Sequence, residues 1–326
     1  MLLMLRVLLA GFSLLSVVMA VHLGHAQDWP ARPIKLVVPF SPGGTADTLG
    51  RVFAQALSES LGQQVYVENR GGAGGMSGSA QVARAEPDGY TLVVSGVASH
   101  VIAPVASARS DYNPVRDFTH IAYFGGPPIV VVAHPSLGVS TFEQLVTLLR
   151  GSSEPLSYGS PGVGTQGHLV AAYVAQKLGL KLAHVPYKGA SPAMFDLLGG
   201  HIKLASVSWT TALSHIESGV VIPIAVTAKM RLARFPAVPT FVELGLPDLI
   251  ATTWFALSGP PGLPSEIVAR LNREVVKAID LPEVRTRLDQ ESIEAEKMDA
   301  AAFTGFIQAE IARWTPIAKL SGVRAE

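Results

Sequence analysis

The sequence contains no cysteine, and only 15% of its 326 residues are charged. Without cysteine the chain forms no disulfides, so packing must supply its stability, and a chain of this length can bury a core large enough to do so. Lysine plus arginine equals aspartate plus glutamate at 25 each. A chain with equal numbers of basic and acidic residues lacks the excess positive charge of a nucleic-acid-binding protein or of a polybasic membrane protein.

Long apolar runs are also missing, except at the amino terminus. Residues 1–20 are almost entirely apolar with Arg6 as their only charge, and Gly24 and Ala26 are small residues of the kind that signal peptidase prefers. We therefore expect residues 1–26 to be a signal peptide, cleaved after Ala26, and the mature protein to reside in the periplasm. The alternative is an uncleaved membrane anchor, because the run is nearly long enough to span a bilayer. An exported protein meets little ATP or NAD, so no cofactor is expected.

Runs of strand length alternate with helical stripes through the rest of the chain. The runs lie at 34–40, 63–69, 90–96, 128–135, 156–160, 181–187, 202–208, 221–228 and 253–259. Runs that are apolar on both faces are typical of parallel strands buried between helices in α/β proteins. The pattern restarts after residue 127, so we expect two α/β lobes with a ligand cleft between them. The first would comprise residues 27–125 plus 229–326, and the second residues 126–228.

Two similar loops follow strands, one in each expected lobe. Residues 41–47 read SPGGTAD and residues 160–168 read SPGVGTQGH, and a helical pattern begins within each. Ligands of open α/β sheets bind beyond the carboxyl ends of the strands, and the unpaired N–H groups of a helix start favour an anion. The candidate ligand-binding residues are Ser41, Pro42, Gly43, Gly44, Thr45, Ala46, Asp47, Ser95, Ser160, Gly162, Gly164, Thr165 and His168. The alternative, that the serines and threonines are only turn formers and helix caps, stays open.

Asp47 needs a separate interpretation, because its carboxylate would repel an anionic ligand. We expect it to stabilise the helix dipole and to brace the first loop. Residues 67–80 contain five glycines after a strand. A flexible linker would not normally fall between two elements of one sheet, so we expect a tight loop beside the cleft, oriented by Glu68, Asn69 and Arg70.

More specific motifs of nucleotide-binding proteins and hydrolases are absent from the sequence or incomplete in it. A P-loop would place lysine after its second glycine, but Thr48 stands five residues after Gly43 and no lysine follows. Residues 162–167 match the dinucleotide fingerprint, yet the acidic residue expected about 20 positions later is absent. No Gly-x-Ser-x-Gly elbow occurs.

The histidines of the mature chain are not spaced as metal ligands, because none lies two to four residues from another. No metal site is therefore expected. An exported hydrolase with Ser160 or Ser41 as nucleophile remains the enzymatic alternative. It needs a base beside the serine, and the sequence offers only His168, one helical turn beyond the second loop.

Many ordered segments of the chain resemble one known family, the substrate-binding receptors of tripartite tricarboxylate transporters, also called Bug receptors. The segments are DWPARPIKLVVPFSPGGTAD, VENRGGAGG, EPDGYTL, YNPVRDFTHI, YGSPGVGT, HVPYKGASPA, DLLGGHI and VPTFVELGLP. The resemblance implies a two-lobed periplasmic binding protein of type II-like, Venus flytrap architecture, not an enzyme. It also implies a monomer that holds a small carboxylate or related organic solute between its lobes, gripped by backbone amides around 42–47 and 160–165. Its partners would be the membrane components of a transporter; a sensor kinase as partner is the alternative.

The chain departs from the family pattern at two places. Gly71 stands where the family usually has proline, a change that loosens the glycine-rich loop. After DLLGGH the family commonly has an aspartate near the cleft, whereas this chain has Ser208 and Trp209. We therefore add these two residues to the candidate site, with Trp209 placed to stack on an aromatic or apolar ligand.

Overall fold

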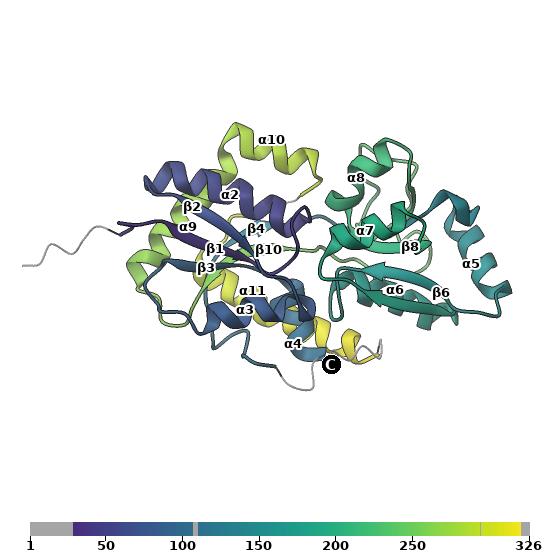
Figure 1. Cartoon of the computed structure of the whole chain (residues 1–326), viewed down its shortest axis with the longest axis horizontal. Helices are drawn as coiled ribbons and strands as arrows, with labels where there is room; N and C mark the ends of the chain where they lie inside the picture. Colours follow the sequence, from purple (N-terminus) through teal and green to yellow (C-terminus); the bar gives the residue numbers. More distant parts are fainter. Residues whose placement is uncertain (1–28, 107–109, 294, 321–326) are drawn as a thin grey trace, which may run out of the picture.

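The structure is a computed structural model that describes residues 29–106, 110–293 and 295–320 (Figure 1). The expected signal peptide, residues 1–26, lies outside the described residues. The described chain forms two five-stranded sheets, each with its own helices, and the two halves lie side by side along the long axis (Figure 1). We call the half that begins at residue 34 the first lobe and the other half the second lobe.

The first lobe is built on a sheet of five strands. They are β1 (Ile34–Val38), β2 (Val65–Asn69), β3 (Thr91–Gly96), β4 (Thr119–Gly125) and β10 (Phe255–Gly259). Their order across the sheet is β2-β1-β3-β10-β4, so the strand nearest the carboxyl terminus lies between two strands from the amino-terminal half.

The second lobe has a sheet of the same size. Its strands are β5 (Ile129–Ala133), β6 (Leu156–Ser160), β7 (Leu182–Pro186), β8 (Leu204–Ser208) and β9 (Ile222–Val226). Their order is β7-β6-β8-β5-β9, the same arrangement with β5 in the place of β10.

The sequence predicts parallel strands throughout, and this is wrong for one strand in each sheet. β1 pairs in parallel with β2 and β3, and β6 with β7 and β8, but β10 and β5 run antiparallel to both neighbours. Both exceptions are the first strand after the chain crosses from the other lobe. A chain that leaves one sheet at its cleft end enters the next sheet at its cleft end. The entering strand therefore runs away from the cleft, whereas the others run toward it.

Helices cover both sheets with their apolar stripes. In the first lobe α2 (Thr45–Leu61) packs Leu49, Phe53 and Leu57 into the core, and it ends at Gly62, whose φ of +69° is the left-handed conformation that glycine adopts readily. The other helical elements of this lobe are η1 (Ala73–Gly75), α3 (Met76–Ala83), η2 (Ala98–Ile102), α4 (Ala103–Ala106), α9 (Ser265–Asp280), α10 (Pro282–Gln290) and α11 (Ala300–Leu320). Those of the second lobe are η3 (Pro135–Leu137), α5 (Phe142–Gly151), α6 (Gln166–Leu178), α7 (Ala190–Leu198) and α8 (Trp209–Glu217).

The return of the chain to the first lobe falls later than the sequence predicts. Phe241, Leu246 and Leu249 were expected in the first lobe, because they follow residue 228, but they are buried in the core of the second lobe. Thr240 also forms a β-bridge with Val226 at the end of β9. Apolar side chains after β9 therefore extend the second lobe before the chain crosses near residue 252.

A separate apolar cluster joins the lobes behind the cleft. Trp254, on the return crossing, is buried there with Phe303 and Trp314 of α11 and with Leu169 of α6. The indole N–H groups of both tryptophans donate to Glu310 Oε2, at 2.9 and 3.1 Å. Because these buried donors are paired, α11 packs against the return crossing without leaving either indole N–H unsatisfied.

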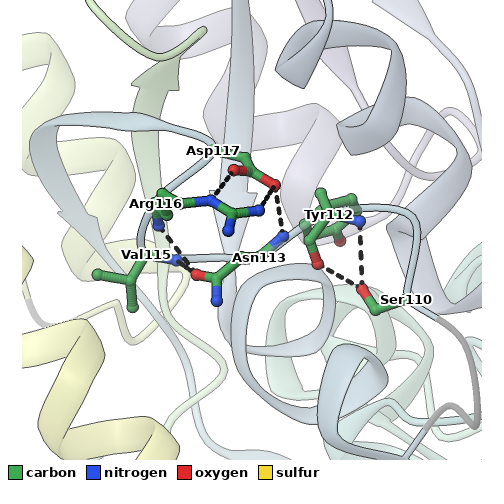
Figure 2. A network of polar contacts seen from close by, with 6 residues as sticks. All are labelled: Ser110, Tyr112, Asn113, Val115, Arg116 and Asp117. Carbon is green, nitrogen blue, oxygen red and sulfur yellow. Dashed lines mark hydrogen bonds and ion pairs between the residues drawn. The ribbon is translucent and has the colours of Figure 1, made fainter.

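The loop that leads into β4 is held by its own polar contacts (Figure 2). Asn113 Oδ1 accepts hydrogen bonds from the backbone N–H groups of Val115 and Arg116, at 3.0 and 2.9 Å. The Asp117 carboxylate accepts from the Asn113 N–H at 2.8 Å and from the Arg116 guanidinium at 2.7 Å. The segment YNPVRD therefore owes its composition to a turn, and we assign it no ligand.

Within the described residues, no helix combines the length and the apolar character that a bilayer-crossing segment requires.

Candidate functional site

A cavity lies between the two lobes, and about 440 Å³ of space between its walls, open solvent at the mouth included, is free of protein atoms. It is lined by Phe40, Gly44, Thr45, Ala46, Ala98, Ile129, Pro161, Thr165, Gln166, Gly167, Ala190, Ser208, Thr253 and Phe255. No lining residue among those the structure describes carries an ionisable side chain. The cavity is therefore mainly apolar, with a few neutral polar groups, as is typical of small-molecule sites.

Two helices begin at this cavity, one from each lobe. Residues 44–46 at the start of α2 and residues 165–167 at the start of α6 all line it. α2 has no side-chain cap, and the hydroxyl of Thr165 accepts from the His168 N–H at 3.4 Å. First-turn N–H groups lack intrahelical partners and carry partial positive charge, so the two starts together favour a negatively charged group.

The expectation that the two Ser-Pro-Gly loops lie at one cleft agrees with this geometry for part of each loop. Of the candidates from the sequence, Gly44, Thr45, Ala46, Thr165 and Ser208 line the cavity. The others lie behind it or at its rim, and their contacts give them other roles.

Ser41 and the tip of the first loop lie at the rim. The Ser41 N–H donates to the backbone oxygen of Lys188 in the second lobe at 3.2 Å, and the Ser41 hydroxyl donates to the same oxygen at 3.1 Å. Pro42 and Gly43 border an outer groove between the lobes, away from the cavity. These contacts show that the first loop closes against the second lobe.

Asp47 braces the first loop, as its position in the sequence predicts. Its carboxylate accepts from the Gly43 N–H at 3.0 Å, from Arg51 Nε at 3.0 Å and from Asn69 Nδ2 at 2.9 Å. Burial alone would raise the pKa of Asp47, but the hydrogen bonds from Arg51, Gly43 and Asn69 outweigh burial and lower it below its usual value. Asp47 is therefore a support for the loop and does not itself line the cavity.

The second loop is supported by a pair of stacked histidines. The rings of His168 and His184 lie 3.7 Å apart, and His168 Nδ1 accepts from the Gly164 N–H at 3.3 Å. Ser160 Oγ lies 2.7 Å from His184 Nε2, and the Thr165 hydroxyl donates to the backbone oxygen of Gly162 at 2.8 Å. Ser160, Gly162, Gly164 and His168, which the sequence nominates as ligand contacts, therefore shape the loop from behind, because their polar groups already bind one another.

These histidines predict a loss of stability in mild acid. Burial lowers the pKa of His168 to about 4, and burial with a smaller contribution from His168 lowers that of His184 to about 3. In the unfolded chain both titrate near 6.5, so only the unfolded state gains protons as the pH falls from 6.5 toward 4. The stability they provide is complete above pH 6.5 and is lost below it.

We expect the unfolding free energy to fall by roughly 2 kcal/mol for His168 between pH 7 and pH 5, and by less for His184, because its half-buried ring is screened by solvent. Urea unfolding across this range would measure it. His168→Gln should make the decline shallower without abolishing it, since burial also lowers the pKa of His100 and His120. His201→Gln, at an exposed position, should leave the decline unchanged. A midpoint that stays constant from pH 7 to pH 5 would contradict the assignment of neutral rings.

Ser95, which the sequence nominates as a ligand contact, lies inside the first sheet and does not line the cavity. It is fully buried, and its hydroxyl lies 2.8 Å from that of Ser258 on β10. Ser258 in turn lies 3.0 Å from His120 Nδ1, while His120 Nε2 lies 3.0 Å from the backbone oxygen of Pro114. A carbonyl only accepts, so His120 Nε2 donates, Nδ1 accepts from Ser258, and Ser258 accepts from Ser95. This chain links β3, β10 and β4 inside the first sheet.

Trp209, which the sequence expects to stack on a ligand, does not line the cavity either. Its side chain is fully buried in the core beneath α8, where it packs edge-on against Phe235 with ring centroids 4.8 Å apart. Ser208 precedes it at the end of β8 and lines the cavity in its place. Successive residues at a strand end point to opposite sides, so only one of the two can face the cleft.

The sequence did not nominate two polar residues that the structure places at the cavity. Gln166 is 1% exposed and Thr253 is 8% exposed, and both line the cavity. Neither amide atom of Gln166 nor the Thr253 hydroxyl has a hydrogen-bond partner among the described residues. Gln166 could have been found, because it directly follows Thr165. Thr253 lies on the return crossing, and nothing in the local sequence marks it.

The described lobes touch on the far side of the first loop as well. Arg234 in the second lobe donates to the backbone oxygen of Gln290 at 3.1 Å and pairs with Glu217 at 2.7 Å. The Thr210 hydroxyl donates to the backbone oxygen of Glu291 at 3.3 Å. Together with the contact of Ser41, these bonds define a closed arrangement of the lobes.

Comparison with known proteins identifies the family. A family model described as the tripartite tricarboxylate transporter family receptor matches residues 49–323. The chain belongs to this family. Among curated proteins, BugT of Bordetella pertussis is 33% identical to it over 300 residues, which cover 92% of each chain. The expected receptor family is thus confirmed.

Solved structures of this receptor family superpose well on the chain. The periplasmic binding protein BugD has a TM-score of 0.87 at 30% identity, with 91% of this chain and all of that one covered. A Rhodopseudomonas palustris protein with adipate has a TM-score of 0.87 at 32% identity, covering 91% and 99%. MatC of the same organism, with bound malate, has a TM-score of 0.85 at 30% identity, covering 89% and 100%. The predicted two-lobed periplasmic binding protein fold is confirmed.

The enzymatic alternative is excluded by the same comparisons, because this family consists of solute-binding receptors. The site agrees with that conclusion. Ser160 is fully buried and contacts His184, not the predicted base His168, and it does not line the cavity. Ser41 donates to a backbone carbonyl and has no histidine partner.

No group of three or more histidine, cysteine, aspartate or glutamate side chains that could hold a metal ion occurs in the parts of the chain that the structure describes.

Proposed function

We propose that this protein is a periplasmic receptor that captures a small carboxylate between its lobes and delivers it to the membrane components of a tripartite tricarboxylate transporter. The observation that carries the proposal is that α2 and α6, one from each lobe, both begin at the same cavity between the lobes. A carboxylate held there would bind both lobes at once, so occupancy would stabilise the closed form that the transporter recognises.

Neutral donors suffice for such binding. A helix start contributes about 0.3–1 kcal/mol to an anion, and a hydrogen bond to a charged group about 1.5–3 kcal/mol. A few of each reach the roughly −8 kcal/mol of micromolar affinity after ordering costs. Two structural relatives support a carboxylate ligand, because one was solved with adipate and the other with malate.

Three further properties belong to this proposal. We propose that residues 1–26 are removed after Ala26 on export, and that the mature receptor works as a monomer without a cofactor. We also propose a division into lobes of 27–125 plus 252–326 and 126–251. It moves the later boundary from residue 228, since residues 241–249 pack in the second core.

The proposal predicts that small acids stabilise the purified mature protein. A carboxylate at 100 times its dissociation constant adds about 2.7 kcal/mol to the unfolding free energy, so the melting temperature should rise by several degrees and continue to rise with concentration. A thermal-shift screen of mono- and dicarboxylates, aromatic acids and amides would measure it. Native mass spectrometry before and after partial unfolding and dialysis would detect an acid that co-purifies. If no acid co-purifies and none shifts the melting temperature, the proposal is wrong.

A further inference from the structure

Two residues that line the cavity carry buried polar atoms that the capture of a carboxylate by two helix starts does not use. These atoms are the two amide atoms of Gln166 and the hydroxyl of Thr253, all buried and without partners among the described residues. A buried polar group without a hydrogen bond destabilises a protein, so such groups in a native cavity call for an explanation. A ligand in the cavity that pairs with them would remove this penalty.

The chemistry of Gln166 restricts what can pair with it. A primary amide presents two N–H donors and one carbonyl acceptor, whichever way its end is oriented. A carboxylate accepts only, so it can satisfy the donors of Gln166 but never its oxygen. The oxygen needs a ligand group that donates a hydrogen bond. The Thr253 hydroxyl both donates and accepts and can serve either kind of partner.

The remainder of the cavity argues against a second charge on the ligand. No described lining residue is a lysine, arginine or histidine, so a second carboxylate would enter an apolar space without a cation. Phe40, Ile129, Ala190 and Phe255 instead offer apolar walls on several sides. Within the described lining, the helix starts favour negative charge, and no cationic side chain adds to them.

We infer that the ligand of this receptor carries one carboxylate, an apolar body and one neutral group that both donates and accepts hydrogen bonds, a carboxamide or a hydroxyl, which Gln166 and Thr253 recognise. This inference rests on the proposed carboxylate-binding function and makes it more specific. Gln166 and Thr253 are then the residues that select the monoamide or hydroxy acid over the dicarboxylate of the same length.

Two matched sets of ligands test the inference by isothermal titration. One set is adipate, its monoamide and hexanoate; the other is terephthalate, its monoamide and benzoate. In at least one set, we expect the monoamide to bind about tenfold or more tightly than the dicarboxylate. Gln166→Leu should reduce this preference to within about threefold. Thr253→Val should weaken binding of the monoamide more than binding of the simple monocarboxylate.

A second measurement separates recognition from folding. Gln166→Leu replaces unpaired buried atoms with apolar ones of similar shape, so the ligand-free protein should melt at a temperature higher by about 2–4 degrees. Gln176→Leu is the matched control, because Gln176 lies exposed on the same helix. It should leave the preference for the monoamide unchanged.

The possible failures can be told apart. If the dicarboxylate binds as tightly as the monoamide in both sets, or if Gln166→Leu keeps the preference, the inference is wrong while the proposed function stands. If none of the acids binds in either set and the wider thermal-shift screen also finds none, the proposed function fails and the inference fails with it.

Discussion

Replacing Gly74 with alanine should lower the affinity for ligand about 100-fold while both lobes stay folded. Gly74 lies in η1 of the first lobe, and a β carbon added there would come within 2.4 Å of the backbone oxygen of Val163 in the second loop. It would also lie 3.1 Å from the Ala103 side chain, so it cannot turn aside. A backbone carbonyl cannot yield that far without moving its loop. The methyl group therefore holds the lobes apart, and a ligand loses the contacts that require both.

The measurement is isothermal titration with the acid that gives the largest thermal shift, together with small-angle scattering of the liganded protein. Gly62→Ala is a matched control, because Gly62 has a φ of +69° against +64° for Gly74, with nothing within 4 Å of the added carbon. Both variants should lose about 1 kcal/mol of stability from the left-handed backbone, but only Gly74→Ala should lose affinity and stay expanded. If Gly74→Ala binds with full affinity and its liganded form is compact, the second loop moves to accommodate the methyl group and the prediction is wrong.

The sequence predicts much of the fold because the relevant signals are local. Apolar runs and helical stripes place the strands, and glycines such as Gly62 and Gly179 end helices in the left-handed conformation. The directions of β5 and β10 are not local properties. They follow from where the chain crosses between lobes, and no periodicity within a strand reports that.

The candidate site likewise contains residues that local sequence patterns predict and residues that they do not. Residues 44–46 and Thr165 could be predicted, because a glycine-rich loop at a helix start is a pattern in the chain itself. Ser160 and His168 belong to the same pattern, but they bind their own loop, since a tight turn needs side chains to hold it. Thr253 reaches the cavity from the return crossing, well beyond Thr165 along the chain. Because the two residues are so far apart in sequence, no local pattern predicts that they line the same cavity.

The inter-lobe contacts also explain why the glycine-rich segment 67–80 has its composition. Added β carbons at Gly71 and Gly74 would collide with backbone oxygens of Lys188 and Val163, both in the second lobe. Glycine at these positions lets the backbones of the two lobes meet directly. The segment is therefore a closure surface beside the cleft, in agreement with the prediction that it is a tight loop and not a linker.

Asp47→Ala should be the most damaging single substitution in the first loop. It removes the acceptor of the Gly43 N–H, of Arg51 and of Asn69, and all three of these hydrogen bonds are partly buried. Lost hydrogen bonds to a buried charge and newly unpaired donors together should cost about 2–4 kcal/mol of unfolding free energy. The start of α2 also loses the negative charge that opposes its dipole.

Binding should suffer beyond the loss of stability. Gly43 and Gly44 hold the first turn of α2 at the cavity, and Asp47 fixes the Gly43 N–H. Without that bond the donors at 44–46 lose their fixed position, and affinity for the acid should fall about tenfold or more. Urea unfolding and isothermal titration would measure the two effects separately.

Asp280→Ala is the control, because Asp280 forms an ion pair with Lys297 at 2.6 Å in which both side chains are about half exposed. Such a pair contributes at most about 1 kcal/mol and lies outside the cavity lining. If Asp47→Ala binds as tightly as the unaltered protein, the glycines hold the loop by themselves and the carboxylate is not its brace.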